Sequence, residues 1–364
     1  MSKYYSLKKI LKYKALYNMI IGQRSNGKTY SVIDLAIERF FKYGYKSAYI
    51  RRLKEDLRPT NLSNLVTPHL DKIIKLSKGK YNKIRYYRGE FNFIYEDEKG
   101  EVIEKSDTFI KTFSLNTWES SKGADNGYFD VIIFDEFLTR DFYLRDEFIV
   151  FTQMLSSLLR DRDGSIIFMI ANTVNKFCPY FSEMGLYNIT KQKQGTIDLY
   201  SYGESGLTVA VEYCKEYDTS STVSKYFAFN NPRLQMITSG AWELALYPHC
   251  PVDYAKQDII GHCYIKFNSQ LVHGEVVYYF DTHSKQDHLF VFFYQQTKET
   301  PIQKIECMFT DEEDSNILHV QSIGDTPTKL HKLVIDLIRE NRDFYATNEV
   351  GEIVRNWKIQ HSLT

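Results

Sequence analysis

The sequence has 364 residues, a length that predicts two or three domains. Hydrophobic residues make up 43% and charged residues 25%, which provides apolar cores and excludes a mainly disordered chain. Lys plus Arg and Asp plus Glu each number 46, so the formal net charge is zero. This balance argues against a protein coated in basic charge for static nucleic-acid binding, although a local basic patch fits it.

Neither a signal peptide nor a membrane span is expected. The lysines near the N-terminus are not followed by a long apolar segment, and no run of about 20 apolar residues occurs. The five scattered cysteines are typical of reduced thiols in a cytosolic protein. The pairs 249–250 and 262–263, each His-Cys, lack the spacing of about two to four residues that zinc ligands use, so we expect a structural role for them.

The first predicted elements are a buried strand over residues 16–21 and a helix over 28–44 that ends at Gly44. Between them, GQRSNGKT matches the phosphate-loop pattern G-x-x-x-x-G-K-[ST]. The strand, loop and helix occur in the order that this pattern requires. We therefore predict a nucleotide-binding loop made of Gly22, Gln23, Arg24, Ser25, Asn26, Gly27, Lys28 and Thr29.

Each residue type in this loop has a chemical reason. Gly22 and Gly27 let the backbone turn its amides inward to form a nest for phosphate oxygens. Lys28 would place a cation against the β and γ phosphates of ATP, and the Thr29 hydroxyl would ligate Mg²⁺. Arg24 would contact either phosphate or a neighbouring subunit, and the sequence leaves both open.

A second strand is predicted over residues 47–52, followed by Lys54. Residues 72–95 carry many lysines and arginines and predict strands and turns. Two interpretations stay open for this stretch. It is either a nucleic-acid-facing insertion or an exposed hairpin with a solvated basic face.

The second strong motif is YFDVIIFDEFLTR, over residues 128–140. Its four apolar residues predict a buried parallel strand that ends in Asp135 and Glu136. Carboxylates at that end of a central strand lie beside the phosphate loop in doubly wound sheets. We predict that Asp135 holds Mg²⁺ and that Glu136 activates the attacking water, in preference to an acidic pair that only caps the next helix.

The paired Asp-Glu, with a strand inserted between the two motif strands, resembles the motor-type branch of phosphate-loop ATPases. The strand-like segment 107–115 lies between the two motifs along the chain. An amphipathic helix over 144–165 then ends near Gly164 and carries Arg160 and Arg162, which either complement the helix dipole or reach a neighbour's γ-phosphate. The next strand, 165–173, ends in Asn172, either a sensor of the γ-phosphate or a turn residue.

Six short motifs follow one another within residues 10–185: IIGQRSNGKTY, YIRRLK, TWESSKG, VIIFDEF, LLRDRD and ANTVNKFCPYF. In this order and spacing they resemble the DNA-encapsidation ATPases of small short-tailed phages, the phi-29-like group. The resemblance thins sharply after residue 200. It implies a motor in the host cytoplasm that hydrolyses ATP to drive double-stranded DNA into an empty procapsid. Such motors are homomeric rings, expected to be pentamers, docked on the portal with a structural RNA in some members.

The resemblance also implies roles for individual residues. Lys28 and Thr29 would bind phosphate and Mg²⁺, and Asp135 and Glu136 would be the hydrolysis pair. Arg160 would be an arginine finger acting in a neighbouring subunit. The remaining basic candidates are Lys54 and Arg162 near the subunit interface, and Lys122 and Arg140 facing DNA in the pore or serving as ordinary surface cations.

The expected fold class is α/β, with a phosphate-loop ATPase domain over 1–200. A linker with a small subdomain is expected over 201–251, and a smaller, strand-rich α+β domain over 252–364 that ends in a helix over 328–347. Larger packaging proteins carry an RNase H-type nuclease there. Asp281 and the acidic run 311–314 do not complete a set of carboxylates at strand ends, so we expect a degenerate nuclease-like domain without cleavage. The alternatives to a DNA motor are a nucleotide-gated assembly or scaffold protein, and another DNA translocase or helicase.

Overall fold

The computed structural model describes residues 4–121, 128–140, 142–159, 164–175, 178–189, 191–216, 242, 247–267, 270–281, 285–295, 307–310, 328–361 and 363. The chain divides into two compact units, Met1–Glu243 and Leu244–Thr364. The expected boundaries at residues 200 and 251 differ from this division.

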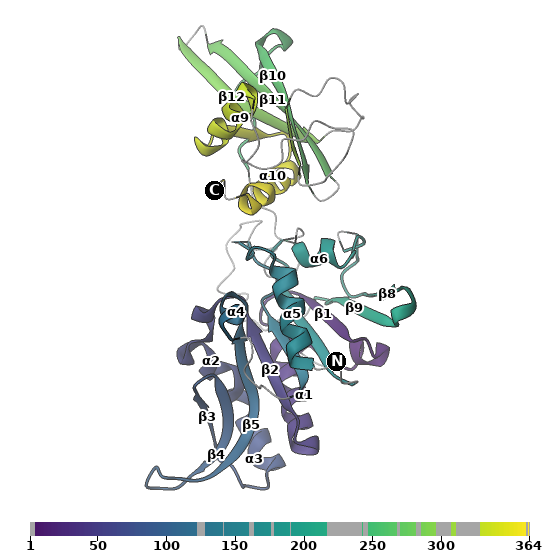
Figure 1. The fold of residues 1–364 in the computed structure, drawn as a ribbon, viewed down its shortest axis with the longest axis vertical. Helices are drawn as coiled ribbons and strands as arrows, with labels where there is room; N and C mark the ends of the chain where they lie inside the picture. Colours follow the sequence, from purple (N-terminus) through teal and green to yellow (C-terminus); the bar gives the residue numbers. More distant parts are fainter. Residues whose placement is uncertain are drawn as a thin grey trace. The chain divides into compact units, whose positions relative to one another are not determined.

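The first unit is built on one sheet with helices packed against it (Figure 1). Among the described residues, its nine strands take the order β3-β4-β5-β2-β6-β7-β1-β9-β8. The strands are β1 (Tyr17–Gly22), β2 (Lys46–Arg51), β3 (Lys83–Tyr87), β4 (Glu90–Glu96), β5 (Val102–Ser114), β6 (Phe129–Asp135), β7 (Ile166–Asn172), β8 (Ile197–Tyr202) and β9 (Leu207–Tyr213). β9 pairs with β1, so residues assigned to a linker from the sequence belong to this sheet.

The six central strands, from β5 to β9 in the sheet order, pair in parallel, and their carboxyl ends therefore meet at one edge. Every residue of β6 is buried, as a parallel strand covered on both faces requires. This arrangement confirms the predicted α/β class. One strand, β7, lies between β1 and β6, which confirms the inserted strand expected between the two motif strands. The segment 107–115, which lies between the motifs along the chain, falls largely in β5, beyond β2. After β6 the chain passes through a helix and forms β7, which pairs between β6 and β1 in the interior of the sheet and not at its edge.

Helices cover both faces of the sheet. On one face lie α1 (Lys28–Tyr43), α2 (Pro59–Val66) and α3 (Leu70–Leu76), and on the other α5 (Glu147–Leu159) and α6 (Pro179–Glu183). The shorter elements of this unit are α4 (Trp118–Ser121) and the 3-10 turns η1 (Ile10–Tyr13), η2 (Lys54–Leu57), η3 (Thr67–His69), η4 (Leu115–Thr117) and η5 (Gly203–Ser205). α1 ends where predicted, because Gly44 adopts a left-handed conformation with φ 74°.

The basic stretch 72–95 consists of the end of α3 and the β3–β4 hairpin, so the expectation of strands and turns throughout was wrong for its first residues. Lys83 pairs with Glu96 and Lys80 with Glu104, at 2.7 Å and 3.0 Å. These surface pairs neutralise part of the basic charge. They favour the interpretation of an exposed hairpin with a solvated face.

The second unit has a five-stranded sheet in the order β13-β10-β11-β12-β14 among its described residues. The elements are η6 (Lys256–Asp258), β10 (Ile259–Phe267), β11 (Gln270–Asp281), β12 (Gln286–Gln295), β13 (Met308–Thr310), α9 (Lys329–Arg339), β14 (Asp343–Tyr345) and α10 (Asn348–Gln360). The helix predicted over 328–347 is shorter, because Asn341 takes φ 56° and turns the chain into β14. Asp281 ends β11, and the acidic run 311–314 lies outside the described residues.

Candidate nucleotide-binding and hydrolysis site

The phosphate loop joins β1 to α1 at the carboxyl edge of the sheet, and its two glycines have different structural reasons. Gly27 precedes α1 in a left-handed conformation with φ 89°. A Cβ atom on Gly22 would lie 2.7 Å from the Cβ of Cys214, so only glycine fits against the segment that follows β9. The tight backbone that the motif predicts is therefore present.

Lys28 is folded into this loop. Its Nζ donates to the carbonyl oxygen of Gln23 at 2.6 Å and to that of Gly22 at 3.3 Å. It also donates to the side-chain oxygens of Asn26 at 3.2 Å and Asn172 at 3.3 Å. Burial lowers the pKa of this ammonium to about 8. Because these partners are neutral oxygens, a bound polyphosphate would supply the negative charge that a buried cation lacks.

Asn172, the predicted sensor, lies at the end of β7 and contacts Lys28 through this 3.3 Å hydrogen bond. Since β7 lies between β1 and β6, its tip separates the phosphate loop from the acidic pair. The strand-end asparagine that the sequence singled out therefore lies beside Lys28, the lysine of the phosphate-loop motif. Its role as a sensor stays a prediction.

Asp135 ends β6 opposite the start of α1. The Thr29 hydroxyl lies 3.3 and 3.4 Å from the two carboxylate oxygens of Asp135, and the Tyr49 hydroxyl donates to one of them at 2.9 Å. Burial raises the pKa of the Asp135 carboxyl, and the nearby Arg51 guanidinium opposes that rise. A carboxylate and a hydroxyl that face each other are hard oxygen ligands of the kind that Mg²⁺ prefers, so these residues fit the predicted metal.

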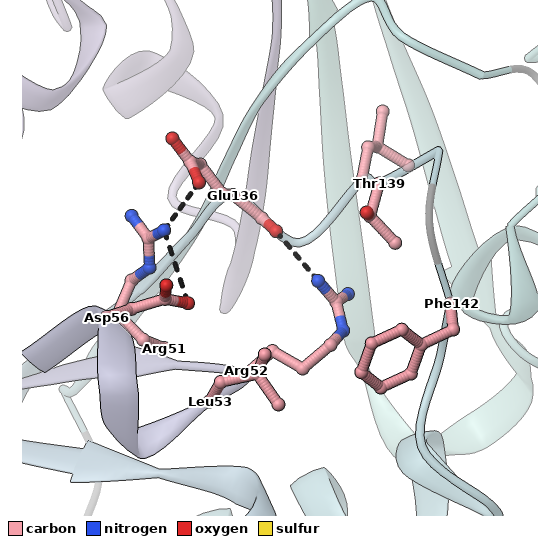
Figure 2. A pocket seen from close by; sticks show the side chains of 8 residues that line it. Arg51, Arg52, Leu53, Asp56, Glu136, Thr139 and Phe142 are labelled. Carbon is pink, nitrogen blue, oxygen red and sulfur yellow. Dashed lines mark hydrogen bonds and ion pairs between the residues drawn. The ribbon is translucent and has the colours of Figure 1, made fainter.

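Glu136 follows in a left-handed conformation, with φ 58°, and its side chain is 56% exposed. Its carboxylate accepts a hydrogen bond of 2.5 Å from Arg51, whose guanidinium also lies 3.4 Å from Asp56 (Figure 2). These groups open onto a pocket of about 160 Å³ lined by Arg51, Arg52, Leu53, Asp56, Glu136, Leu138, Thr139 and Phe142.

Four residues of this region were not singled out from the sequence: Tyr49, Arg51, Arg52 and Glu147. The first three lie on or directly after β2, the strand next to β6. The motif YIRRLK carried a signal for them, because it marks the carboxyl end of a strand that would reach the same edge. Glu147 is the first residue of α5, and only the fold brings it to Arg52, at 2.8 Å.

The other predicted site residues are more scattered. Arg24 is exposed in the loop, Lys54 is exposed at the start of η2, and Arg140 is half-buried after β6. The remaining basic candidates, Lys122, Arg160 and Arg162, lie outside the described residues.

The cysteines have free thiols, and all except Cys250 are buried. The Cys250 thiol donates to the carbonyl of Val252 at 3.1 Å, and His262 forms a hydrogen bond of 3.0 Å with His273. In the described part of the chain, no group of three or more His, Cys, Asp or Glu residues could hold a metal ion. Within the same ranges, no helix has the length and apolar character needed to cross a membrane.

Two known phage proteins are similar to this chain over half of its length. The DNA packaging proteins of Bacillus phages phi29 and PZA are each 28% identical to this chain over 184 residues, which are 50% of this chain and 49% of either relative. The chain thus spans about half the length of the curated relatives it matches. The bacteriophage Phi-29 genome packaging motor assembly shares the fold, with a TM-score of 0.55, 16% identity and 100% of both chains covered.

The Phi-28 gp11 DNA packaging motor gives a TM-score of 0.50 at 15% identity, covering 100% of this chain and 99% of that one. These two likenesses show that the chain shares its fold with these packaging motors. The family model described as podovirus DNA encapsidation protein (Gp16) matches residues 1–221, more than half of the sequence. This chain therefore belongs to the podovirus DNA encapsidation protein (Gp16) family.

Proposed function

We propose that this protein is an ATPase motor that drives double-stranded DNA into a viral procapsid. The observation that carries the proposal is the meeting of Lys28, Thr29, Asp135 and Glu136 at one edge of the sheet, although they come from segments far apart in the sequence. Membership of the encapsidation family supports DNA as the substrate, because the relatives are named DNA packaging proteins.

In the proposed site, the loop amides and Lys28 bind the phosphates of ATP. Lys28 would exchange its bonds to Gly22 and Gln23 for bonds to charged oxygens, which stabilise an ammonium better. Thr29 and Asp135 would hold Mg²⁺. When bound, that ion would withdraw electron density from the phosphate oxygens and offset developing charge.

Glu136 is the proposed general base. It would take a proton from a water whose oxygen forms a bond to the γ-phosphorus, while the bond to the bridging oxygen breaks and ADP keeps that oxygen. Its exposed side chain lies on the rim of the pocket, where a water has access. Asn172 would respond to loss of the γ-phosphate, a role that its hydrogen bond to Lys28 supports.

We further propose a homomeric ring, in which Arg160 reaches the neighbour's γ-phosphate and Lys54 and Arg162 lie near the interface. Lys122 and Arg140 would grip DNA phosphates in the pore without reading sequence. The ring would dock on the portal in the host cytoplasm, as a pentamer and with a structural RNA in the arrangement that the resemblance implies. Support comes from the position of each residue in its motif.

The decisive experiment is the steady-state ATPase rate with and without double-stranded DNA, over a salt series, for the wild type and Glu136→Gln. We expect DNA to stimulate hydrolysis, salt to weaken the stimulation, and the variant to bind nucleotide without turning it over. Normal hydrolysis by Glu136→Gln would contradict the assigned chemistry. Hydrolysis that ignores DNA, at concentrations where rings form, would favour a nucleotide-gated assembly protein, which the zero net charge also fits.

For residues 252–364 we propose a degenerate nuclease-like domain that binds the portal, RNA or DNA without cutting. Asp281 lies at the end of β11, and the sequence offers no clear second and third carboxylate at matching strand ends. Metal-dependent DNA cleavage that disappears in Asp281→Asn would overturn this proposal. Unchanged DNA after long incubation with Mg²⁺ or Mn²⁺ is the expected result.

A further inference from the structure

A buried ion pair between Arg52 and Glu147 contacts the backbone of Glu136, the proposed general base. Arg52 follows the last residue of β2, and Glu147 begins α5. Arg52 Nε donates to one Glu147 oxygen at 2.8 Å and Nη2 donates to the other at 2.9 Å. The two side chains are 9% and 0% exposed, so this is a bidentate pair held out of solvent.

The same guanidinium also binds the backbone of the proposed catalytic segment. Its Nη1 donates to the carbonyl oxygen of Glu136 at 3.3 Å (Figure 2). Its Nη2 donates to the carbonyl oxygen of Phe137 at 2.7 Å. Arg52 therefore contacts the backbone at Glu136 and one residue beyond it. It does not approach the Glu136 carboxylate, which Arg51 binds instead.

Glu147 fixes the position of Arg52 from the other side. Its carboxylate accepts a hydrogen bond from the Tyr180 hydroxyl at 2.9 Å and one from the Leu144 amide at 2.8 Å. The Tyr143 ring lies 4.8 Å from the guanidinium carbon of Arg52. The pair thus joins the end of β2, the segment after β6, the start of α5 and α6.

A buried ion pair stabilises a fold little, because desolvation of the two charges offsets their attraction. What such a pair supplies is a defined geometry. The backbone of Glu136 needs such a fixed geometry, because its φ of 58° is a conformation that residues other than glycine and asparagine seldom adopt. If the backbone at Glu136 and Phe137 were free to relax, the Glu136 carboxylate would leave the strand in another direction.

We propose that Arg52, held by Glu147, is a positioning residue that fixes the backbone of Glu136 and Phe137 and thereby aims the Glu136 carboxylate during hydrolysis. The inference rests on the proposed function, because it assumes that Glu136 is the general base. It predicts a loss of turnover with nucleotide binding intact.

The test begins with Arg52→Lys, which keeps a positive charge beside Glu147 but lacks the planar fork that reaches two carboxylate oxygens and two carbonyls together. We expect kcat to fall on the order of 10- to 100-fold, as misplacement of a reacting group does. The dissociation constant of a fluorescent ATP analogue should stay within about twofold, since Arg52 does not contact the phosphate loop.

Arg39→Lys is the matched control. Arg39 also binds a carboxylate with two nitrogens, that of Asp130 (Nη2–Oδ1 2.7 Å), and Asp130 lies on β6 at the end opposite Glu136. The same substitution there should leave kcat unchanged. An equal loss of kcat in both lysine variants would mean that any weakened ion pair slows the enzyme, which would overturn the positioning role.

A double-mutant cycle gives a readout that a purely structural role would not produce. In single-turnover measurements, Arg52→Lys should cause no further loss in a Glu136→Gln background, because its effect passes through the Glu136 carboxylate. A full additional loss would overturn the inference. Wild-type kcat in Arg52→Lys with an inactive Glu136→Gln would overturn the positioning role alone, whereas an active Glu136→Gln would overturn the proposed function and this inference together.

If Arg52→Lys does not fold, the pair is replaced as a unit by Arg52→Met with Glu147→Leu, which leaves no buried charge unpaired. This variant should unfold near the wild-type temperature, bind the ATP analogue and hydrolyse ATP slowly. Wild-type kcat in this apolar variant would show that the hydrogen bonds from Arg52 are not needed to position the backbone of Glu136, and the inference would be wrong.

Discussion

The hydroxyl of Tyr49 donates a 2.9 Å hydrogen bond to the carboxylate of Asp135, and both side chains are buried at neighbouring strands of the sheet. Tyr49 lies on β2 and Asp135 ends β6. The bond orients a carboxylate that also lies beside the Thr29 hydroxyl. The carboxylate of Asp135, which would hold Mg²⁺, is therefore oriented by Tyr49, which would not contact the ion.

Tyr49→Phe should remove this orienting bond with almost no change in volume. We expect the Mg²⁺ concentration for half-maximal ATPase activity to rise on the order of tenfold, as loss of an outer partner does at metal sites. Thermal unfolding should report a loss of about 1 kcal/mol. Tyr86→Phe, which loses a hydroxyl bonded to Leu57 and Thr112 away from the site, should leave the Mg²⁺ requirement unchanged. Equal requirements in the two variants would contradict the role given to Tyr49.

ATP affinity should depend on pH through Lys28. Burial lowers the pKa of Lys28 to about 8 in the free protein, and negatively charged phosphates would raise it again. Binding therefore takes up a proton above that pH, and affinity should fall as pH rises from about 8 toward the ordinary lysine value of about 10.4. Calorimetry in buffers of different ionisation enthalpy measures the proton uptake. Lys28→Arg should bind more weakly but with no such pH dependence, since arginine stays charged.

The left-handed conformation of Glu136 should affect the free energy of unfolding of variants at this position. Glu136→Asn and Glu136→Gln both remove the carboxylate that Arg51 binds, but asparagine tolerates φ 58° better. We expect the asparagine variant to be the more stable by about 1 kcal/mol. At Glu38, an exposed residue of α1, the order should reverse because glutamine is the better helix former. The same order at both positions would argue against backbone strain at Glu136.

Gly351 should not accept alanine, although it lies inside α10. Alanine in a helix usually gains about 1 kcal/mol over glycine. Here a Cβ would lie 2.2 Å from the Tyr247 ring, which is fixed by bonds of its hydroxyl to Glu352 and of its amide to Asn348. We therefore expect Gly351→Ala to cost about 1–3 kcal/mol in unfolding of this unit. With Tyr247→Ala already present, the same change should become neutral or favourable.

Local patterns predicted the parts of this site that lie on one continuous segment. The strand, loop and helix around Lys28 and the apolar strand ending in Asp135 each carry their chemistry in a few adjacent residues. α1 even ends at its predicted glycine. Such features depend on backbone geometry and a burial pattern that are determined by the residues of one short segment.

Contacts between distant segments were not predictable in the same way. Tyr49 and Arg52 face Asp135 and Glu147 only because β2 pairs with β6, and no pattern within β2 indicates its neighbour. In the second unit, one asparagine at φ 56° ended a helix whose apolar periodicity continued past it.

The pairing of β1 has a consequence for how the protein forms. This strand carries the phosphate loop near the start of the chain, yet its two partners are β7 and β9, which end at Asn172 and Tyr213. During synthesis, the first motif leaves the ribosome long before either partner exists. Contacts of such large sequence separation form late and slowly. The nascent chain should therefore acquire affinity for ATP only after residue 213 has emerged, and growing chains should not compete with finished protein for nucleotide.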